Sequence, residues 1–254
     1  MSDLVRSQAD AGLTTITLDS PASRNALSSA LLTQLRAALT GALAAAGCRV
    51  IVLTGAGTVF CAGADLKEAR SGRAAAPELF PEILQLIWDS PKPVICRVNG
   101  SARAGGIGLI AAADIAIAPL PATFAFTEVR IGVVPAIISV PCLRRMPPRA
   151  AAEYFLTGEV FDAVRAAEIG LLTRAVEPAG LDAEVQRYAG MLLSGAPTAL
   201  AAAKDVLREV PALPFAGGLA RMAELSASGF ASPEAREGMA AFAEKRPPSW
   251  APQP

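Results

Sequence analysis

The spacing of apolar residues along the chain alternates between that of a strand and that of a helix. Residues 13–18, Leu-Thr-Thr-Ile-Thr-Leu, alternate polar and apolar side chains, which predicts a strand that ends in a turn at 19–21. From 31 to 43, apolar residues recur every three or four positions. This spacing predicts a helix with Ser28 as its N-cap.

The same alternation returns further along the chain. Residues 49–54 predict a buried strand, and residues 78–89 carry the apolar stripe of a helix. Residues 93–98 and 115–118 predict two more strands, with a short helix at 107–113 between them. Strands that are apolar on both faces lie in sheets covered by helices on each side. This order therefore predicts an α/β core.

The C-terminal quarter has a different pattern. From about Leu181 onward the spacing is helical throughout, with no convincing strand. Ser194-Gly195-Ala196-Pro197 ends one predicted helix and starts the next. We therefore divide the chain into a core of residues 1–193 and a C-terminal helical region of residues 194–254.

Composition narrows the classes of function. The chain has 254 residues, and 23 Lys and Arg balance 23 Asp and Glu, which leaves no net charge to attract nucleic acid or an anionic membrane. Its longest apolar stretch, roughly 107–126, is interrupted by Asp114 and two prolines, so we expect no membrane helix. Four cysteines without Cys-x-x-Cys spacing, and the lack of a signal peptide, predict reduced thiols in a cytoplasmic protein.

The sequence contains no histidine. Ser-His-Asp and Cys-His nucleophile systems and the commonest zinc sites all need an imidazole, so these chemistries are excluded. We expect no metal site.

Two glycine-rich segments each follow a predicted strand. The first, from Gly55 to Leu66, begins like a dinucleotide-binding motif, but Phe60 stands in place of the third glycine and we reject that interpretation. The second, from Asn99 to Gly108, leads into a helix. Taken alone, the first segment is explained by a tight strand-to-helix turn, and the glycines of the second by close helix packing. Together, loops at the ends of successive strands can each supply one backbone N–H to an oxyanion hole.

Glu128 lies among apolar residues in the segment 124–135. Desolvation there would favour the protonated carboxyl and make Glu128 a competent general acid or base. An ion pair with Arg130, two residues on, is the alternative. This segment by itself does not distinguish the two.

Taken together, these segments resemble the crotonase family, the superfamily of enoyl-CoA hydratases and isomerases. The resemblance covers nearly the whole chain in many ordered motifs. It includes both glycine-rich segments, Arg24-Asn25-Ala26-Leu27, Pro93-Val94-Ile95, Asp114, Arg236-Glu237-Gly238-Met239, Phe242 and Glu244-Lys245-Arg246.

The resemblance implies an α/β fold built as a spiral of ββα units, followed by a helical region that mediates trimerisation. It implies a homotrimer or a hexamer formed as a dimer of trimers. It also implies an acyl-CoA thioester substrate, with no cofactor beyond the CoA of the substrate itself.

The resemblance also implies roles for individual residues. The backbone N–H groups of Ala64 and Gly105 would hold the thioester oxygen as it becomes an enolate oxygen, and Glu128 would be the acid/base. Residues around 70–90 and 130–145 would form the acyl wall, and Ala69–Pro77 a mobile lip. Positions that match the CoA groove are Arg24, Ala26, Ala62, Asp65 and Leu66, with Phe242 and Lys245 reaching the CoA moiety, in some members from a neighbouring subunit.

One departure from the family bears on mechanism. Typical hydratases place two glutamates over the substrate double bond; Glu128 matches the second, and the first falls on Gly108. A single carboxylate can still move a proton to and from water, or shuttle one between the α and γ carbons. Local likeness to bacterial methylglutaconyl-CoA hydratases, in 106–109, 128–132 and 135–139, favours hydration.

We therefore expect an enoyl-CoA hydratase, a lyase that adds water across a 2-enoyl-CoA double bond with Glu128 as acid/base. The alternatives are an enoyl-CoA double-bond isomerase that uses Glu128 as its one proton shuttle, and a non-catalytic acyl-CoA-binding protein. Thioester hydrolysis or decarboxylation is a third possibility within the fold.

Overall fold

The computed structural model describes residues 3–71 and 78–252, and in this part of the chain the strands form two sheets. The larger sheet has six strands in the order β1-β2-β3-β5-β7-β10. All neighbours pair in parallel except β1 and β2, which form an antiparallel hairpin. The strands are β1 (Val5–Asp10), β2 (Leu13–Leu18), β3 (Val50–Gly55), β5 (Val94–Arg97), β7 (Ile115–Pro119) and β10 (Arg174–Val176).

The smaller sheet has four strands of only two or three residues, in the order β4-β6-β8-β9. Its first three strands pair in parallel and the last pair is antiparallel. They are β4 (Val59–Cys61), β6 (Ser101–Arg103), β8 (Thr123–Ala125) and β9 (Phe161–Asp162). Each of β4, β6 and β8 follows a strand of the larger sheet along the chain, so each ββ step carries the backbone from one sheet to the other.

Helices cover both faces of the larger sheet. Those that follow the strands are α1 (Ser29–Ala44), α2 (Leu66–Arg70), α3 (Leu79–Trp88), α4 (Gly105–Ala112), α5 (Ala136–Cys142), α6 (Pro148–Thr157), α7 (Ala163–Glu168) and α8 (Leu181–Ser194). Short 3-10 turns are η1 (Pro21–Ser23), η2 (Thr127–Ile131), η3 (Pro178–Gly180) and η4 (Val210–Ala212). The C-terminal helices are α9 (Pro197–Glu209), α10 (Phe215–Phe230) and α11 (Pro233–Ala243).

The two faces of β3 belong to two separate cores. Ile51 and Leu53 pack into the cluster with α1, α3 and α4, whereas Val50 and Val52 pack against α8. Every residue of β3 is buried, because helices lie on both sides of it. The α/β core predicted from the sequence is thus confirmed.

The helix N-cap predicted at Ser28 is also present, since its hydroxyl accepts the Leu31 N–H at 3.3 Å. The hairpin strand β1 was not predicted, because five of its six residues are exposed and it has no apolar alternation to detect. The strands of the smaller sheet were not predicted either, because two or three residues are too few to show a period.

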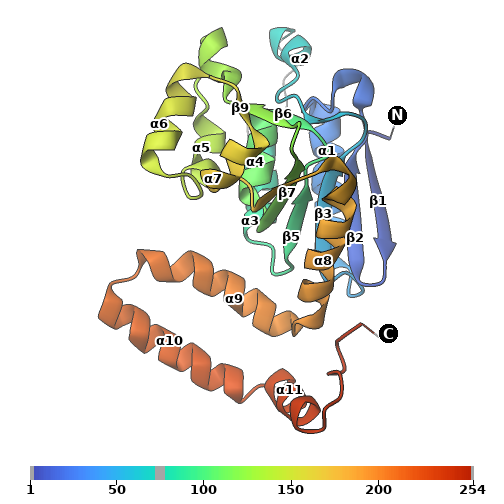
Figure 1. The fold of residues 1–254 in the computed structure, drawn as a ribbon, viewed down its shortest axis with the longest axis vertical. Helices are drawn as coiled ribbons and strands as arrows, with labels where there is room; N and C mark the ends of the chain where they lie inside the picture. The colour runs from blue at the N-terminus through green and yellow to red at the C-terminus, as the bar shows by residue number, and fades with distance from the viewer. Residues whose placement is uncertain (1–2, 72–77, 253–254) are drawn as a thin grey trace.

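Helices α9, α10 and α11 lie apart from the sheets, in the lower part of Figure 1. Residues 195–196 are not helical and separate these helices from α8, which packs on the sheet. Lys204 of α9 joins this region to the core: its buried ammonium pairs with Asp114 and donates to the Lys92 carbonyl. Asp114 in turn accepts the Val94 N–H at 2.8 Å. Within the described ranges, no helix is long and apolar enough to span a bilayer.

Candidate functional site

The two glycine-rich segments lie side by side in the structure. Strands β4 and β6 pair in parallel, so the turns that follow them emerge at the same edge of the smaller sheet. Gly63 adopts φ +89° and touches the second loop closely: a Cβ built on it would lie 2.9 Å from the Ala104 Cβ. Only glycine fits there, because the backbone conformation and the close approach both exclude a side chain.

Each loop carries a backbone N–H that no other group in the described residues uses. Ala64 is exposed and Gly105 half-exposed, and neither N–H takes part in a hydrogen bond among residues 3–71 and 78–252. Gly105 is the first residue of α4, where N–H groups have no intrahelical acceptor and the helix dipole favours negative charge. Each loop therefore has one backbone donor that is available to a ligand.

The segment 24–27 fixes the first of these loops from its other side. Ala62 donates to the Arg24 carbonyl at 3.0 Å, and Leu27 donates to the Gly63 carbonyl at 2.8 Å. Leu27 also forms a parallel bridge with Ala64. These contacts bring together the five groove residues expected from the sequence: Arg24, Ala26, Ala62, Asp65 and Leu66. Asp65 also caps α2, accepting the N–H groups of Lys67 and Glu68.

Asn25 is fully buried and clamps the turn between β3 and β4. Its amide nitrogen donates to the carbonyls of Ala56, Val59 and Phe60 at 2.8–3.2 Å. Its amide oxygen accepts the Ser20 N–H at 2.9 Å. No hydrophobic or charged side chain can satisfy these groups, so the turn that leads to Ala64 depends on an amide at this position.

We expect Asn25→Ala to lower the free energy of unfolding by about 2–4 kcal/mol, because buried carbonyls and an N–H lose their partner. Urea denaturation measures this loss. Asn99→Ala is the matched control: Asn99 bonds to the same turn, through the Gly55 N–H and the Gly57 carbonyl, but is only half-buried. An equal or larger loss for Asn99→Ala would contradict the importance assigned to Asn25.

Glu128 lies in η2 with one carboxyl oxygen buried and without a hydrogen-bond partner in the described part of the chain. Arg130 does not pair with it: the Arg130 side chain turns to the end of α6 and donates to the Thr157 carbonyl at 3.3 Å. Burial raises the pKa of Glu128, and the residue's own backbone N–H lowers it by less. The site thus holds a carboxyl group with free proton-accepting capacity.

Helix α5 packs against the glycine-rich helix α4. The pKa of the Cys142 thiol on α5 is raised by burial and, less strongly, by the charge of Glu128. One turn earlier on the same buried face of α5, Ile138 meets Gly108 of α4, where a Cβ would lie 2.6 Å from the Ile138 Cγ2. The Phe80 ring touches both Gly105 and Gly108, at 3.4 and 3.6 Å from built Cβ positions.

The raised pKa of Glu128 predicts a pH dependence. Because the folded protein holds this proton more tightly than the unfolded chain, the stability contribution of Glu128 falls as pH rises from its ordinary 4.5 through the raised value. Glu128→Gln should therefore melt at a higher temperature than wild type at pH 7–8. The gap should close below about pH 4, where the unfolded chain is protonated as well. A gap independent of pH, measured by thermal melts in buffers across this range, would contradict the burial of this carboxyl.

Sequence reasoning assigned no individual role to Phe80, Ile138 or Cys142, although all three fall in the ranges expected to form the acyl wall. Most of the lip expected at Ala69–Pro77 lies outside the described residues. Cys61, next to the first loop, is a buried small residue whose thiol pKa burial raises to about 12, which leaves it unreactive.

Phe242 and Lys245 do not join these residues within one chain. Helix α11 and the turn after it lie at the opposite end of the molecule from α2 and α4 (Figure 1). The Phe242 side chain is 88% exposed. In this conformation of a single chain, these two residues therefore do not contact a ligand bound at the glycine-rich loops.

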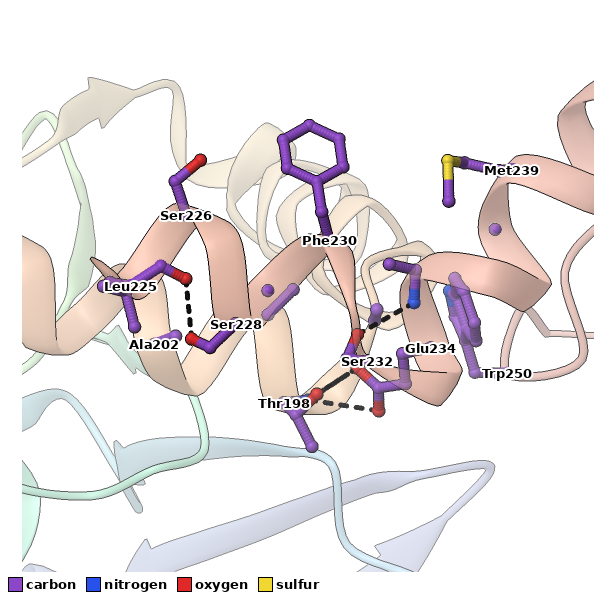
Figure 2. Close-up of a pocket in the computed structure, with 15 residues that line it drawn as sticks. Thr198, Ala202, Leu225, Ser226, Ser228, Phe230, Ser232, Glu234, Met239 and Trp250 are labelled. Atoms are coloured by element: carbon purple, nitrogen blue, oxygen red, sulfur yellow. Dashed lines mark hydrogen bonds between the residues drawn. The ribbon is translucent and has the colours of Figure 1, made fainter. Parts of the chain in front are cut away.

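A cavity of about 640 Å³ lies between α9, α10 and α11 (Figure 2). Small and apolar side chains dominate its lining, including Phe230, Met239 and Trp250. Glu234 is its one titratable group, and its carboxylate already accepts the Thr198 N–H at 3.1–3.2 Å. This cavity is remote from the glycine-rich loops and offers no group for acid/base chemistry.

Comparison with known proteins matches the chain to a family model described as enoyl-CoA hydratase/isomerase, over residues 8–253. A carnitinyl-CoA dehydratase of Citrobacter koseri is 36% identical over 80% of this chain and 81% of the relative. The mitochondrial enoyl-CoA hydratase domain-containing protein 3 of Mus musculus is 34% identical over 94% and 81%. The crystal structure of an enoyl-CoA hydratase from Shewanella pealeana superposes with a TM-score of 0.92 at 32% identity, covering 98% of this chain and 96% of that one.

Proposed function

Because the chain belongs to the enoyl-CoA hydratase/isomerase family of crotonase-fold proteins, we propose that it hydrates a 2-enoyl-CoA thioester with Glu128 as the acid/base. The observation that carries this proposal is the buried carboxyl oxygen of Glu128, which has no hydrogen-bond partner among the described residues. A carboxyl without a structural partner is free to accept and return a proton.

The N–H groups of Ala64 and Gly105 would bind the thioester oxygen. As hydroxide adds at the β carbon, electrons move through the former double bond onto this oxygen, which becomes an enolate oxygen. Fixed donors that face the growing charge stabilise this state more than the substrate. The rigid contact between Gly63 and Ala104 would keep both donors in place throughout.

Glu128 would act twice in one turnover. In its ionised form it takes a proton from water as the water oxygen bonds to the β carbon. It then gives that proton to the α carbon as the enolate collapses, which restores the carboxylate and yields a 3-hydroxyacyl-CoA. Desolvation keeps the pKa of Glu128 above its ordinary value, which favours the second step.

Double-bond isomerisation is the second candidate, and the contact between Gly108 and Ile138 favours it. That contact fills the place in which a second carboxylate would lie, so Glu128 is the one acid/base group we assign. As an isomerase, Glu128 would remove a proton from the α carbon of a 3-enoyl ester and return it to the γ carbon. This reaction needs one base and no water.

Mass spectrometry of the protein incubated with 2-enoyl-CoA and 3-enoyl-CoA esters distinguishes the candidates. Hydration adds the mass of one water to a 2-enoyl ester. Isomerisation leaves the mass unchanged while a 3-enoyl ester gains the ultraviolet absorbance of a conjugated thioester. Binding without either change, across a panel of chain lengths, would overturn both and indicate an acyl-CoA-binding protein.

We also propose that the chain self-associates as a trimer, or as a hexamer of two trimers. Large apolar side chains are exposed on the C-terminal helices, among them Phe215, Phe230 and Phe242 at 70–88% exposure. A neighbouring copy would cover them, and this would allow Phe242 and Lys245 to reach its CoA groove. Light scattering should give a mass of three or six chains; a monomer would contradict this assembly.

A further inference from the structure

We propose that Ile138 is a specificity-determining residue: seated against Gly108, it closes the acyl pocket beside the α and β carbons and excludes substrates branched at that point. The inference rests on the proposed function, which gives the position of the acyl group in the site. It adds which acyl shapes the site accepts, because hydration or isomerisation alone does not define the shape of the substrate.

The position of Gly108 relative to the oxyanion donors places it beside the acyl carbons. Gly105 and Gly108 are three residues apart on α4, which is about 4.5 Å along a helix axis. An acyl group held by its carbonyl oxygen at the Gly105 N–H spans this distance with its next few carbons. The Phe80 ring touches both glycines, so it follows the same path.

Ile138 fills the space that the missing side chain of Gly108 leaves. A Cβ at position 108 would lie 2.6 Å from the Ile138 Cγ2 and 3.2 Å from its Cβ. Both Gly108 and Ile138 are buried, so neither side can yield without moving α4 or α5. The two residues are therefore complementary in shape: Ile138 fills the space beside Gly108, and no empty space remains there for an acidic side chain.

Ile138 also lies one turn from Cys142 on the buried face of α5. The same face of α5 thus runs from the contact with Gly108 to Cys142, whose thiol pKa is raised by burial and, less strongly, by the charge of Glu128. A β-branched side chain at this point is stiff and cannot swing aside for a substituent on the substrate. Truncating it should open room next to the reacting carbons.

The first test measures acyl selectivity without turnover. Calorimetry compares the affinities for butanoyl-CoA and 3-methylbutanoyl-CoA, two saturated esters that differ by one methyl group. We expect Ile138→Ala to shift the ratio about tenfold toward the branched ester. Leu156→Ala is the matched control, because Leu156 is 77% exposed on α6, lies outside the ranges expected to form the acyl wall and should leave the ratio unchanged.

The second test measures the pairing itself by a double-mutant cycle. Gly108→Ala should lower the melting temperature by about 5 °C or more, because an added methyl group overpacks this contact. In the Ile138→Ala background the same change should cost little or nothing. Gly190→Ala is the control, since Gly190 is exposed in α8 with no atom within 4 Å of an added Cβ.

An affinity ratio within about twofold of wild type for Ile138→Ala, or a Gly108→Ala protein as stable as wild type, overturns the inference. If Ile138→Ala does not fold, Ile138→Val should shift the ratio in the same direction by a smaller factor. These readouts need binding and folding only. Failure of the proposed reaction, seen as wild type that binds these esters but converts no enoyl ester, is therefore distinguishable from failure of this inference.

Discussion

Replacing Glu128 with glutamine should lower turnover of enoyl-CoA esters by about 10²–10⁴-fold, the contribution typical of a positioned general acid/base. The amide has nearly the shape of the carboxyl but cannot accept or return the proton. Binding should persist, because the oxyanion donors and the groove residues are unchanged. Turnover is followed by mass spectrometry, and the affinity for a saturated ester by calorimetry.

Measuring turnover and affinity together distinguishes an acid/base role of Glu128 from a structural role. Loss of turnover with loss of binding would indicate a structural role for Glu128 rather than an acid/base role. Arg130→Ala is a matched control two residues away, because Arg130 is exposed and contacts the end of α6. Unchanged turnover in Glu128→Gln would remove Glu128 from the mechanism.

Gly63→Ala should lower turnover by about 10²–10³-fold, the usual cost of losing an oxyanion donor. The new methyl group would lie 2.9 Å from the Ala104 Cβ and 3.1 Å from the Arg103 carbonyl oxygen. Relief of this contact must move one loop away from the other. The N–H groups of Ala64 and Gly105 would then be too far apart to bind one oxygen together, as we propose they do.

A control separates this geometric effect from backbone strain. Gly12 has φ +86°, close to the +89° of Gly63, but lies in the β1–β2 hairpin, where an added Cβ would meet only side-chain atoms, those of Leu193 at 3.1 Å and Arg49 at 3.9–4.0 Å. Both alanine variants share the cost of a left-handed backbone, about 1–2 kcal/mol. We expect Gly12→Ala to melt earlier while turning over normally. Equal loss of turnover in both variants would contradict the role of the loops.

Much of the core could be predicted because its elements are long and buried on a regular pattern. The strand at 13–18 is β2, the helix capped by Ser28 is α1, and residues 115–118 lie in β7. The exposed edge strand β1 and the short strands of the smaller sheet could not be predicted. They are held by pairing with neighbours rather than by their own side-chain period.

The parts of the candidate site that could be predicted are those with a signal in the local sequence. The two loops stand out through their glycine content, and Glu128 stands out as a charged residue in an apolar segment. The contact of Ile138 with Gly108 has no such signal, since the two residues are thirty positions apart along the chain. The position of Arg130 also required the structure, because spacing alone does not show which way a side chain turns.

The oxyanion donors that we propose belong to the main chain, at Ala64 and Gly105, whereas the proposed proton donor and acceptor is a side chain. A single nucleotide change can remove Glu128, but no substitution at position 64, apart from proline, deletes the N–H there. Over evolutionary time the ability to bind and polarise a thioester should therefore outlast any one reaction. Descendants of such a protein could acquire new chemistry by moving an acid or base to another wall of the same pocket.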